Sequence, residues 1–247
     1  MNATGPGLSA EELTFSERIQ RIFFAPRLAF EAIRGRETAN DWLLPVLLVC
    51  LVGLAAHYLT LDVLTDLEAP AVQQALGTMD EAERKRYEEN AAMMRDVGWM
   101  MIPVGVFTSL VLVGWVLLVL GRSLLQAEVT FRQVLVIKAY AGMAVAVEWL
   151  LRAMMVLSTG DRGVDLGPGA FLSDGLATSF GGRVIMGLNP FDLWQIGIMG
   201  VGLSTMAGVS TRKATIALLV LWLLWLMGGA ALQIASQNLV SAPLPQE

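Results

Sequence analysis

FRQVLVIKAYAGMAVAVEWLLRAMMVLS, residues 131–158, is the only long apolar run in this chain that carries ionisable side chains inside it. An isolated charge at the centre of a bilayer costs roughly 2.5 to 3.5 kcal/mol. Lys138 and Glu148 must therefore be shielded, paired or close to an interface. Small residues between 139 and 146 make the middle of this run narrow, which suits a helix surrounded by other helices. The run is predicted to lie at the centre of a bundle.

Composition indicates an integral membrane protein. Of 247 residues, 55% are hydrophobic and 16% are charged, and the mean hydropathy is +0.59; an average soluble domain has about 25% charged residues. The net charge of -5 and the lack of a basic stripe argue against binding nucleic acid. The single cysteine, Cys50, cannot form a disulfide framework or a zinc cluster within one chain. No cofactor and no metal are expected.

Hydropathy predicts an all-α, polytopic helical bundle with five membrane spans. The apolar runs cover residues 42–61, 97–121, 133–157, 191–210 and 214–234 of a membrane domain at 42–234, and about 20 apolar residues suffice to cross a bilayer. The polar stretch 62–96 is expected in water, with a solvated helix at 79–94. Residues 1–13 are predicted to be a flexible amino terminus, and residues 235–247 a polar tail.

An amphipathic pair of short helices is predicted ahead of the first span, over residues 14–36. Thr14 and Glu17 fit a capping box, and Pro26 should break the helix into two pieces. The pattern is typical of helices lying in the membrane interface, where their arginines contact anionic headgroups. The alternative is a solvated face on helices that pack against the bundle.

Four polar side chains of the central run admit two interpretations. Lys138 can extend its stem toward the near interface, while Glu148 and Arg152, four residues apart, can pair on one helix face. The sharper alternative is a polar pathway through Lys138, Tyr140 and Glu148. Ten residues separate Lys138 from Glu148, about 15 Å of helix axis, so the two cannot pair directly within a straight helix.

The start of the fourth span carries a helix-capping pattern. Asn189 can cap the helix, Pro190 suits its first position, and Asp192 complements the positive end of the helix dipole. A functional role for a buried Asp192 is the alternative. Further along, Gly200, Ser204 and Gly208 form a ridge of small residues suited to close helix contact.

Catalytic and metal-binding motifs are weak or missing. The glycine-rich stretch 161–183 has neither Walker nor EF-hand spacing, and the sequence contains no HExxH motif and no nucleophile elbow. The lone His57 is expected to be interfacial or structural. The protein is predicted not to be an enzyme.

Charge predicts the orientation. With the amino terminus inside, nine basic residues lie in short inside segments and seven lie in long outside loops, which agrees with the positive-inside rule. We expect a cytoplasmic amino terminus and an outside carboxyl terminus, in the plasma membrane or, in a bacterium, the inner membrane.

Three segments in order, IFFAPRLAFEAI, FRQVLVIKAYA and LNPFDLWQIGIMGVGL followed by STRKATIAL, carry a family likeness. With this five-span profile, the chain resembles the Yip family, named for interaction with Ypt/Rab GTPases, over about residues 15–230, and it looks like a bacterial-type member. The resemblance implies five membrane helices and a cytoplasmic amino terminus. Eukaryotic relatives are associated with vesicle traffic, and many bacterial relatives have no assigned activity. The matching positions are Pro26, Phe131, Tyr140, Asn189, Pro190 and Trp194.

Two functions remain open at this point. The first is a non-enzymatic protein that organises membrane, lipid or protein partners, motivated by the small-residue ridge, the amphipathic helices and the family likeness. Its partners would be the lipid bilayer and a membrane protein or a second copy of the chain. The alternative is a small-solute transporter or channel that uses Lys138, Tyr140 and Glu148 of the third span.

Overall fold

The computed structural model describes residues 13–240. Within that range every regular element is helical, which confirms the all-α fold class. The predicted flexible segment at 1–13 lies outside the described residues except for its last residue, and so do the last seven residues of the predicted polar tail. The helix α11 (Thr211–Val240) continues past residue 234, where the fifth span was predicted to end.

Two short helices open the described chain, as predicted. The first, α1 (Phe15–Phe24), starts with the Thr14 capping box to Glu17, and α2 (Pro26–Glu31) begins directly after Ala25. Pro26 takes the first helical position, where its missing N–H costs nothing. Ala25 is the break, because its backbone leaves the helical region at φ −146° and ψ 59°.

In the part of the chain that the structure describes, four helices are long and apolar enough to cross a membrane. They are α3 (Asn40–Thr65), α5 (Glu81–Val119) with the π-helical turn η1 (Leu120–Leu124), α6 (Phe131–Ala141) with α7 (Met143–Thr159), and α11. A fifth results if α9 (Phe180–Met186) and α10 (Pro190–Ala207), bent by 65°, count as one span. The structure thus has four to five candidate spans, and a polytopic bundle is confirmed.

The second long helix is more continuous than the hydropathy pattern suggests. The helix α5, whose 39 residues extend for about 58 Å, contains all but the first two residues of the predicted solvated helix at 79–94 and all but the last two of the predicted span at 97–121. The Asp80 capping box to Glu83 starts it. Pro103 lies inside the helix without ending it, as neighbouring helices in membrane proteins often permit.

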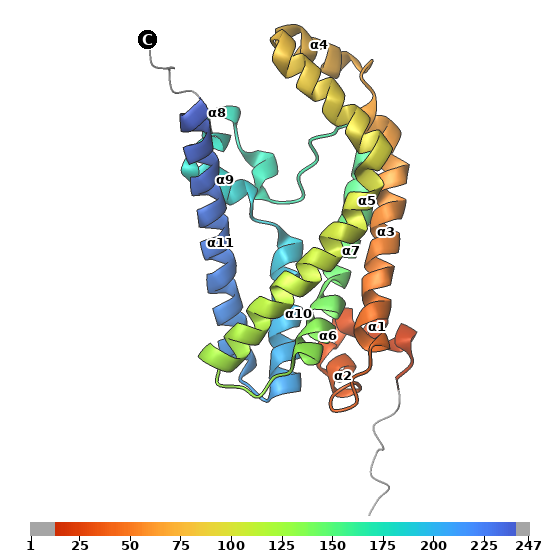
Figure 1. Ribbon diagram of the computed structural model, residues 1–247, viewed down its shortest axis with the longest axis vertical. Helices are drawn as coiled ribbons and strands as arrows, with labels where there is room; N and C mark the ends of the chain where they lie inside the picture. Colours follow the sequence, from red (N-terminus) through yellow and green to blue (C-terminus); the bar gives the residue numbers. More distant parts are fainter. Residues whose placement is uncertain (1–12, 241–247) are drawn as a thin grey trace, which may run out of the picture.

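The short helices lie at the two ends of the bundle. Figure 1 shows α1, α2, the start of α6 and the start of α11 at the lower end, and α4 (Pro70–Thr78), α8 (Asp174–Ala177) and α9 at the upper end. The 3-10 turn η2 (Pro168–Phe171) lies in the connection from α7 to α8. Successive long helices run in opposite directions: α3, α5, α6 with α7, α10 and α11. The two ends of the described chain therefore lie at opposite ends of the bundle.

The central span is the most enclosed, as its narrow sequence predicts. In its most apolar stretch 61% of the residues are buried, against 11% for α11. Val134, Ile137 and Tyr140 of α6 are fully buried. The span is interrupted at Gly142, between α6 and α7.

Glycines bring α10 close to its neighbours, partly as the ridge pattern predicts. A Cβ at Gly200 would lie 2.0 Å from Thr215 Oγ1 of α11, and one at Gly202 would lie 2.8 Å from Ile137 of α6. Gly208 does not continue the ridge, because it ends α10 in the left-handed conformation with φ +71°. Only Gly allows such a conformation without strain.

Candidate functional site

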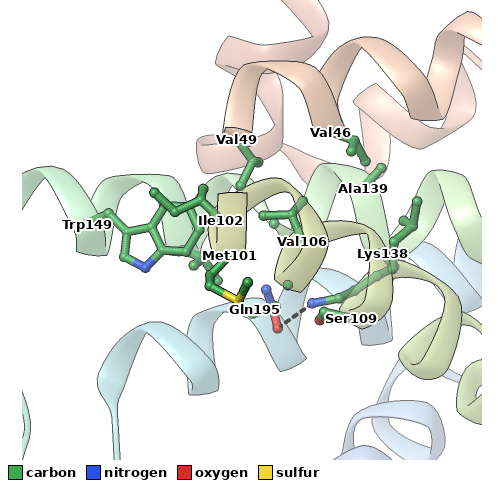
Figure 2. Close-up of a pocket in the computed structure, with 14 residues that line it drawn as sticks. Val46, Val49, Met101, Ile102, Val106, Ser109, Lys138, Ala139, Trp149 and Gln195 are labelled. Atoms are coloured by element: carbon green, nitrogen blue, oxygen red, sulfur yellow. Dashed lines mark hydrogen bonds between the residues drawn. The ribbon is translucent and has the colours of Figure 1, made fainter. Parts of the chain in front are cut away.

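The candidate site is centred on Lys138, which α6 holds inside the bundle. Its side chain is 8% exposed, and its Nζ donates to Oε1 of Gln195 on α10 at 3.1 Å. Gln195 is equally buried, and its amide donates to the Ala141 carbonyl at 3.4 Å. The expectation that Lys138 extends toward the near interface is wrong, because an internal acceptor on a neighbouring helix is within reach (Figure 2).

Asp192 lies one turn before Gln195 on α10. It is within electrostatic range of one charged side chain on α6 and one on α7. Its carboxylate is attracted by the Lys138 ammonium and repelled by the Glu148 carboxylate. Opposite charges that compensate one another lower the cost of burial in a membrane. Asp192 is thus more than a dipole partner for its own helix.

The capping pattern at the start of α10 is confirmed. Asn189 Oδ1 accepts from the Phe191 N–H at 2.9 Å, and Pro190 takes the first helical position. Asp192 falls in the first turn. This cap determines where α10 begins and hence the depth at which Asp192 and Gln195 face α6.

Glu148 and Arg152 form the predicted pair on α7, with 3.2 Å between Nη2 and Oε1. Arg152 also donates from Nη1 to the Val164 carbonyl at 2.8 Å, which ties the end of α7 to the following connection. Lys138 and Glu148 do not pair directly, as predicted. Asp192, from a different helix, interacts with both of them.

Tyr140 does not belong to this polar cluster. It lies two residues beyond Lys138 and therefore on another face of α6, where its ring packs edge-on against Phe30 of α2 at 6.2 Å between centroids. Its hydroxyl is buried with no hydrogen-bond partner among the described residues. The proposed pathway through Lys138, Tyr140 and Glu148 is accordingly not continuous at Tyr140.

A cavity of about 320 Å³ lies beside Lys138. Residues of α3, α5 and α7 form walls that are mostly apolar, and Lys138, Gln195 and Ser109 supply the polar groups. Figure 2 shows these three side chains close together, with Trp149 at a distance from them. An apolar cavity with a few convergent polar groups is the usual form of a small-molecule site.

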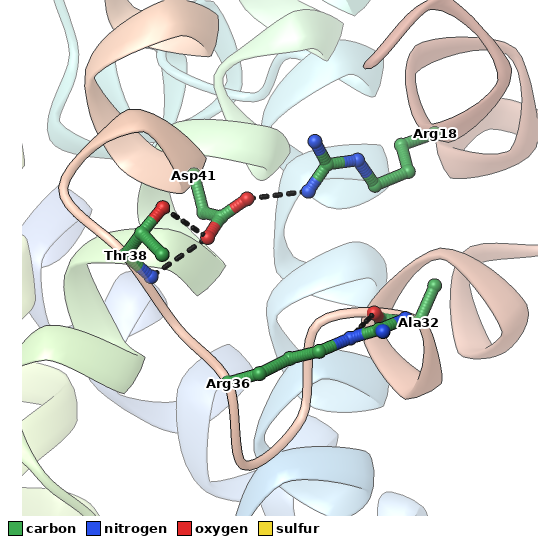
Figure 3. Close-up of polar contacts among 5 residues, drawn as sticks. All are labelled: Arg18, Ala32, Arg36, Thr38 and Asp41. Carbon is green, nitrogen blue, oxygen red and sulfur yellow. Dashed lines mark hydrogen bonds and ion pairs between the residues drawn. The ribbon is translucent and has the colours of Figure 1, made fainter. Parts of the chain in front are cut away.

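The second polar contact region holds the amphipathic pair against the bundle. Arg18 of α1 forms an ion pair with Asp41 at the start of α3, and Asp41 also accepts from the Thr38 N–H and hydroxyl at 2.7 Å each (Figure 3). Arg36, after α2, donates to the Ala32 carbonyl at 2.7 Å.

Aromatic contacts hold the amphipathic helices α1 and α2 against α10. Trp194 packs against Phe23 of α1 at 5.5 Å between ring centroids, and Gly202 accommodates Phe30 of α2. Trp194 and Gly202 are eight residues apart, about 12 Å of helix axis. Pro26 therefore has a structural role, since it starts the helix that carries Phe30.

Sequence reasoning missed Gln195 and Ser109. Gln195 is an amide inside an apolar span, three residues after Asp192 and so on a neighbouring part of the same helix surface. That spacing is a detectable signal. The hydrogen bond between Gln195 and Lys138, which is 57 residues earlier, leaves no detectable signal in a single sequence.

A bundle of long apolar helices with internally compensated charges defines an integral membrane protein of the polytopic class. The chain belongs to the family of the Yip1 domain, whose family model matches residues 21–232, and this confirms the resemblance inferred from the sequence. No curated protein and no solved structure gives a match.

Proposed function

We propose that this protein is not an enzyme and that it organises the bilayer and the membrane proteins around it. The observation that carries the proposal is how the amphipathic helices α1 and α2 pack against the bundle. The pair is fixed to the side of α10 and leaves Phe24 at the break between α1 and α2 91% exposed.

The pair has two different faces. Its inner face is apolar and packed, with Ile22 and Phe30 fully buried. Its outer face combines exposed Phe24 and Leu28 with the surface pair Arg27 and Glu31. Apolar side chains among charges are typical of a helix in the headgroup region. Such a helix displaces lipid in one leaflet, and here it is rigidly coupled to membrane spans.

The basic residues favour placing the pair on the cytoplasmic side. The end of the bundle that holds α1 and α2 also holds Arg122 of η1, Arg132 at the start of α6, and Arg212 and Lys213 at the start of α11. Under the positive-inside rule, that end faces the cytoplasm. The amphipathic pair would then meet the anionic inner leaflet, and the end of α11 would lie outside.

An environment-sensitive fluorophore tests the position of the pair. Cys50→Ala removes the only thiol, and Phe24→Cys then carries the label in protein reconstituted into vesicles. We expect blue-shifted emission that is quenched from the lipid phase. The same label at Glu31→Cys is the matched control and should respond to an aqueous quencher. A label at residue 24 that behaves like the control contradicts the proposal.

Native mass spectrometry of the gently extracted protein tests the organising role itself. We expect a lipid or a membrane protein to co-purify reproducibly, and a Phe24→Ser, Leu28→Ser variant to lose it. A bare chain in repeated preparations argues against the role.

The buried charges favour a second candidate, a small-solute transporter or channel. Lys138 of α6 and Glu148 of α7 are buried, and Asp192 of α10 lies within electrostatic range of both. If this cluster conducts a solute, Lys138→Met and Glu148→Gln should each reduce flux in proteoliposomes. Unchanged flux in both variants eliminates this candidate.

A further inference from the structure

We propose that the cavity between α3, α5 and α7 binds a single-chain amphiphile with an anionic head, of the fatty-acid type. The head lies at Lys138 and Gln195, and the tail lies along the apolar walls. This site is separate from the amphipathic pair, so the proposal stands or fails independently of the organising role.

The polar end of the cavity has unused capacity to bind an anion. A lysine ammonium can donate three hydrogen bonds, and the described residues provide one acceptor, the neutral amide of Gln195 at 3.1 Å. Asp192 acts on Lys138 at longer range, and no described carboxylate forms an ion pair with it. Ser109 also lines the cavity, and its hydroxyl is an additional donor. A carboxylate is the acceptor that these groups would bind most strongly.

The remainder of the cavity suits an apolar chain. Val49, Ile102 and Val106 line it, and so does Trp149, which lies eleven residues beyond Lys138, about 16 Å along the helix axis. The volume of about 320 Å³ is near the lower limit for ligand pockets. A cavity of this length and volume accommodates one chain rather than the two chains of a phospholipid.

The ligand can enter from the bilayer. Met101 and Gly105 line the cavity, and both are exposed at the outer surface of α5. An amphiphile dissolved in the membrane therefore reaches the cavity sideways, between helices. No passage through water is required.

Gly105 allows the cavity to be filled without disturbing the fold. Gly105 lines the cavity, and a Cβ at this position meets no atom within 4 Å, so a leucine side chain there extends without a clash into the open space where the cavity meets the surface of α5. Gly197 of α10 is equally open and does not line the cavity. Gly105→Leu and Gly197→Leu are thus a matched test and control.

Photolabelling of the purified full-length protein tests the site. The probe is dodecanoic acid with a diazirine at its tail, and labelled peptides are mapped by mass spectrometry. We expect labelling of the cavity walls on α5 and α7. Lys138→Met should reduce it by about tenfold, as expected when one strong contact is lost, and Gly105→Leu should reduce it because the new side chain competes with the ligand for space. Gly197→Leu and the surface variant Lys213→Met should not.

Two further probes distinguish the ligand class. Dodecanol with the same diazirine lacks the anionic head and should label the cavity much less. Phosphatidylglycerol with a diazirine-bearing tail should also label it weakly. Equal labelling by the acid and the alcohol, equal labelling by the phospholipid, or labelling that neither cavity variant reduces would overturn the proposal. If Gly105→Leu does not fold, Lys138→Met with its control decides alone.

Discussion

Arg18 at the start of α1 and Asp41 in the first turn of α3 form an ion pair in which both side chains are largely buried, at 17% and 10% exposure. The carboxylate of Asp41 also holds Thr38, directly before the span. One acidic side chain thus joins the amphipathic pair, the connection after it and the first span. The amphipathic helices α1 and α2 are therefore part of the folded membrane domain.

Removing the Arg18 guanidinium should loosen the amphipathic pair. Arg18→Ala leaves the Asp41 carboxylate without its ionic partner in a largely buried site. We expect a loss of about 1 to 3 kcal/mol in the free energy of unfolding, below the about 3 to 5 kcal/mol of a fully buried broken pair because water retains some access. Thermal unfolding in detergent measures the loss, and limited proteolysis should show faster cleavage near residues 25 and 35.

Arg27→Ala is the matched control for that experiment. Arg27 pairs with Glu31 at 3.8 Å, and both side chains are at least half exposed. Exposed pairs of this kind contribute about 0 to 1 kcal/mol. Equal losses for Arg18→Ala and Arg27→Ala would mean that the Arg18 pair does not hold the helices in place.

The close approach of α10 and α11 should make Gly200 intolerant of a side chain. In Gly200→Ala the new Cβ would lie 2.0 Å from Thr215 Oγ1 and 3.2 Å from the Thr215 backbone, so the helices must separate. We expect a destabilisation of about 1 to 3 kcal/mol, measured by thermal unfolding. Thr215→Ala in the same chain should recover part of it.

Gly197→Ala provides the comparison on the same helix. No atom lies within 4 Å of a Cβ there, and alanine is a better helix former than glycine by about 0.5 to 1 kcal/mol. This variant should therefore be neutral or slightly stabilised. If both glycine variants are equally tolerated, the contact between α10 and α11 is looser than the structure shows.

A double-mutant cycle measures the contact between Lys138 and Gln195. Gln195→Leu removes the one acceptor that the described residues offer to the Lys138 ammonium and should cost about 1 to 3 kcal/mol. Lys138→Met with Gln195→Leu should cost less than the sum of the two single changes. The coupling expected for a hydrogen bond between membrane helices is about 0.6 to 1.7 kcal/mol. Additive losses would show that the two side chains do not interact.

Glu37, between α2 and α3, should make stability depend on pH in the acid range. Burial raises the pKa of its carboxyl, but hydrogen bonds from the Gly35 N–H at 2.9 Å and the Gln133 amide at 3.1 Å outweigh burial. The pKa is therefore below the ordinary value of 4.5. A lowered folded-state pKa stabilises the protein fully above 4.5, and this stabilisation is lost as the pH falls through the lowered value.

Comparison with Glu37→Gln isolates this effect. The difference in unfolding free energy between the two proteins should be constant near neutral pH and should shrink on acidification below about 4.5. Other titrating groups cancel in the difference. Chemical denaturation at a series of pH values measures it, and a difference that grows on acidification would contradict the assigned direction.

Local sequence patterns predicted much of the helical architecture. The capping box at Thr14, the break at Pro26 and the cap at Asn189 are confirmed because each depends on residues within four positions of one another. The Glu148 and Arg152 pair follows from helix periodicity in the same way. The prediction that Gly208 continues the ridge of small residues was wrong. Gly208 ends α10 as its C-cap, and a sequence pattern does not distinguish a glycine that packs against a helix from one that caps a helix.

The sequence by itself determined that this chain is a polytopic membrane bundle with a broken amphipathic helix ahead of it, because composition, periodicity and capping act over a few neighbouring residues. Only the tertiary structure decided that Lys138 meets Gln195, that Asp192 interacts with the charges of two other helices, and that a cavity opens beside them. These contacts join residues more than forty positions apart. The physical reason is that helix depth and rotation result from packing the whole bundle, and no local pattern encodes them.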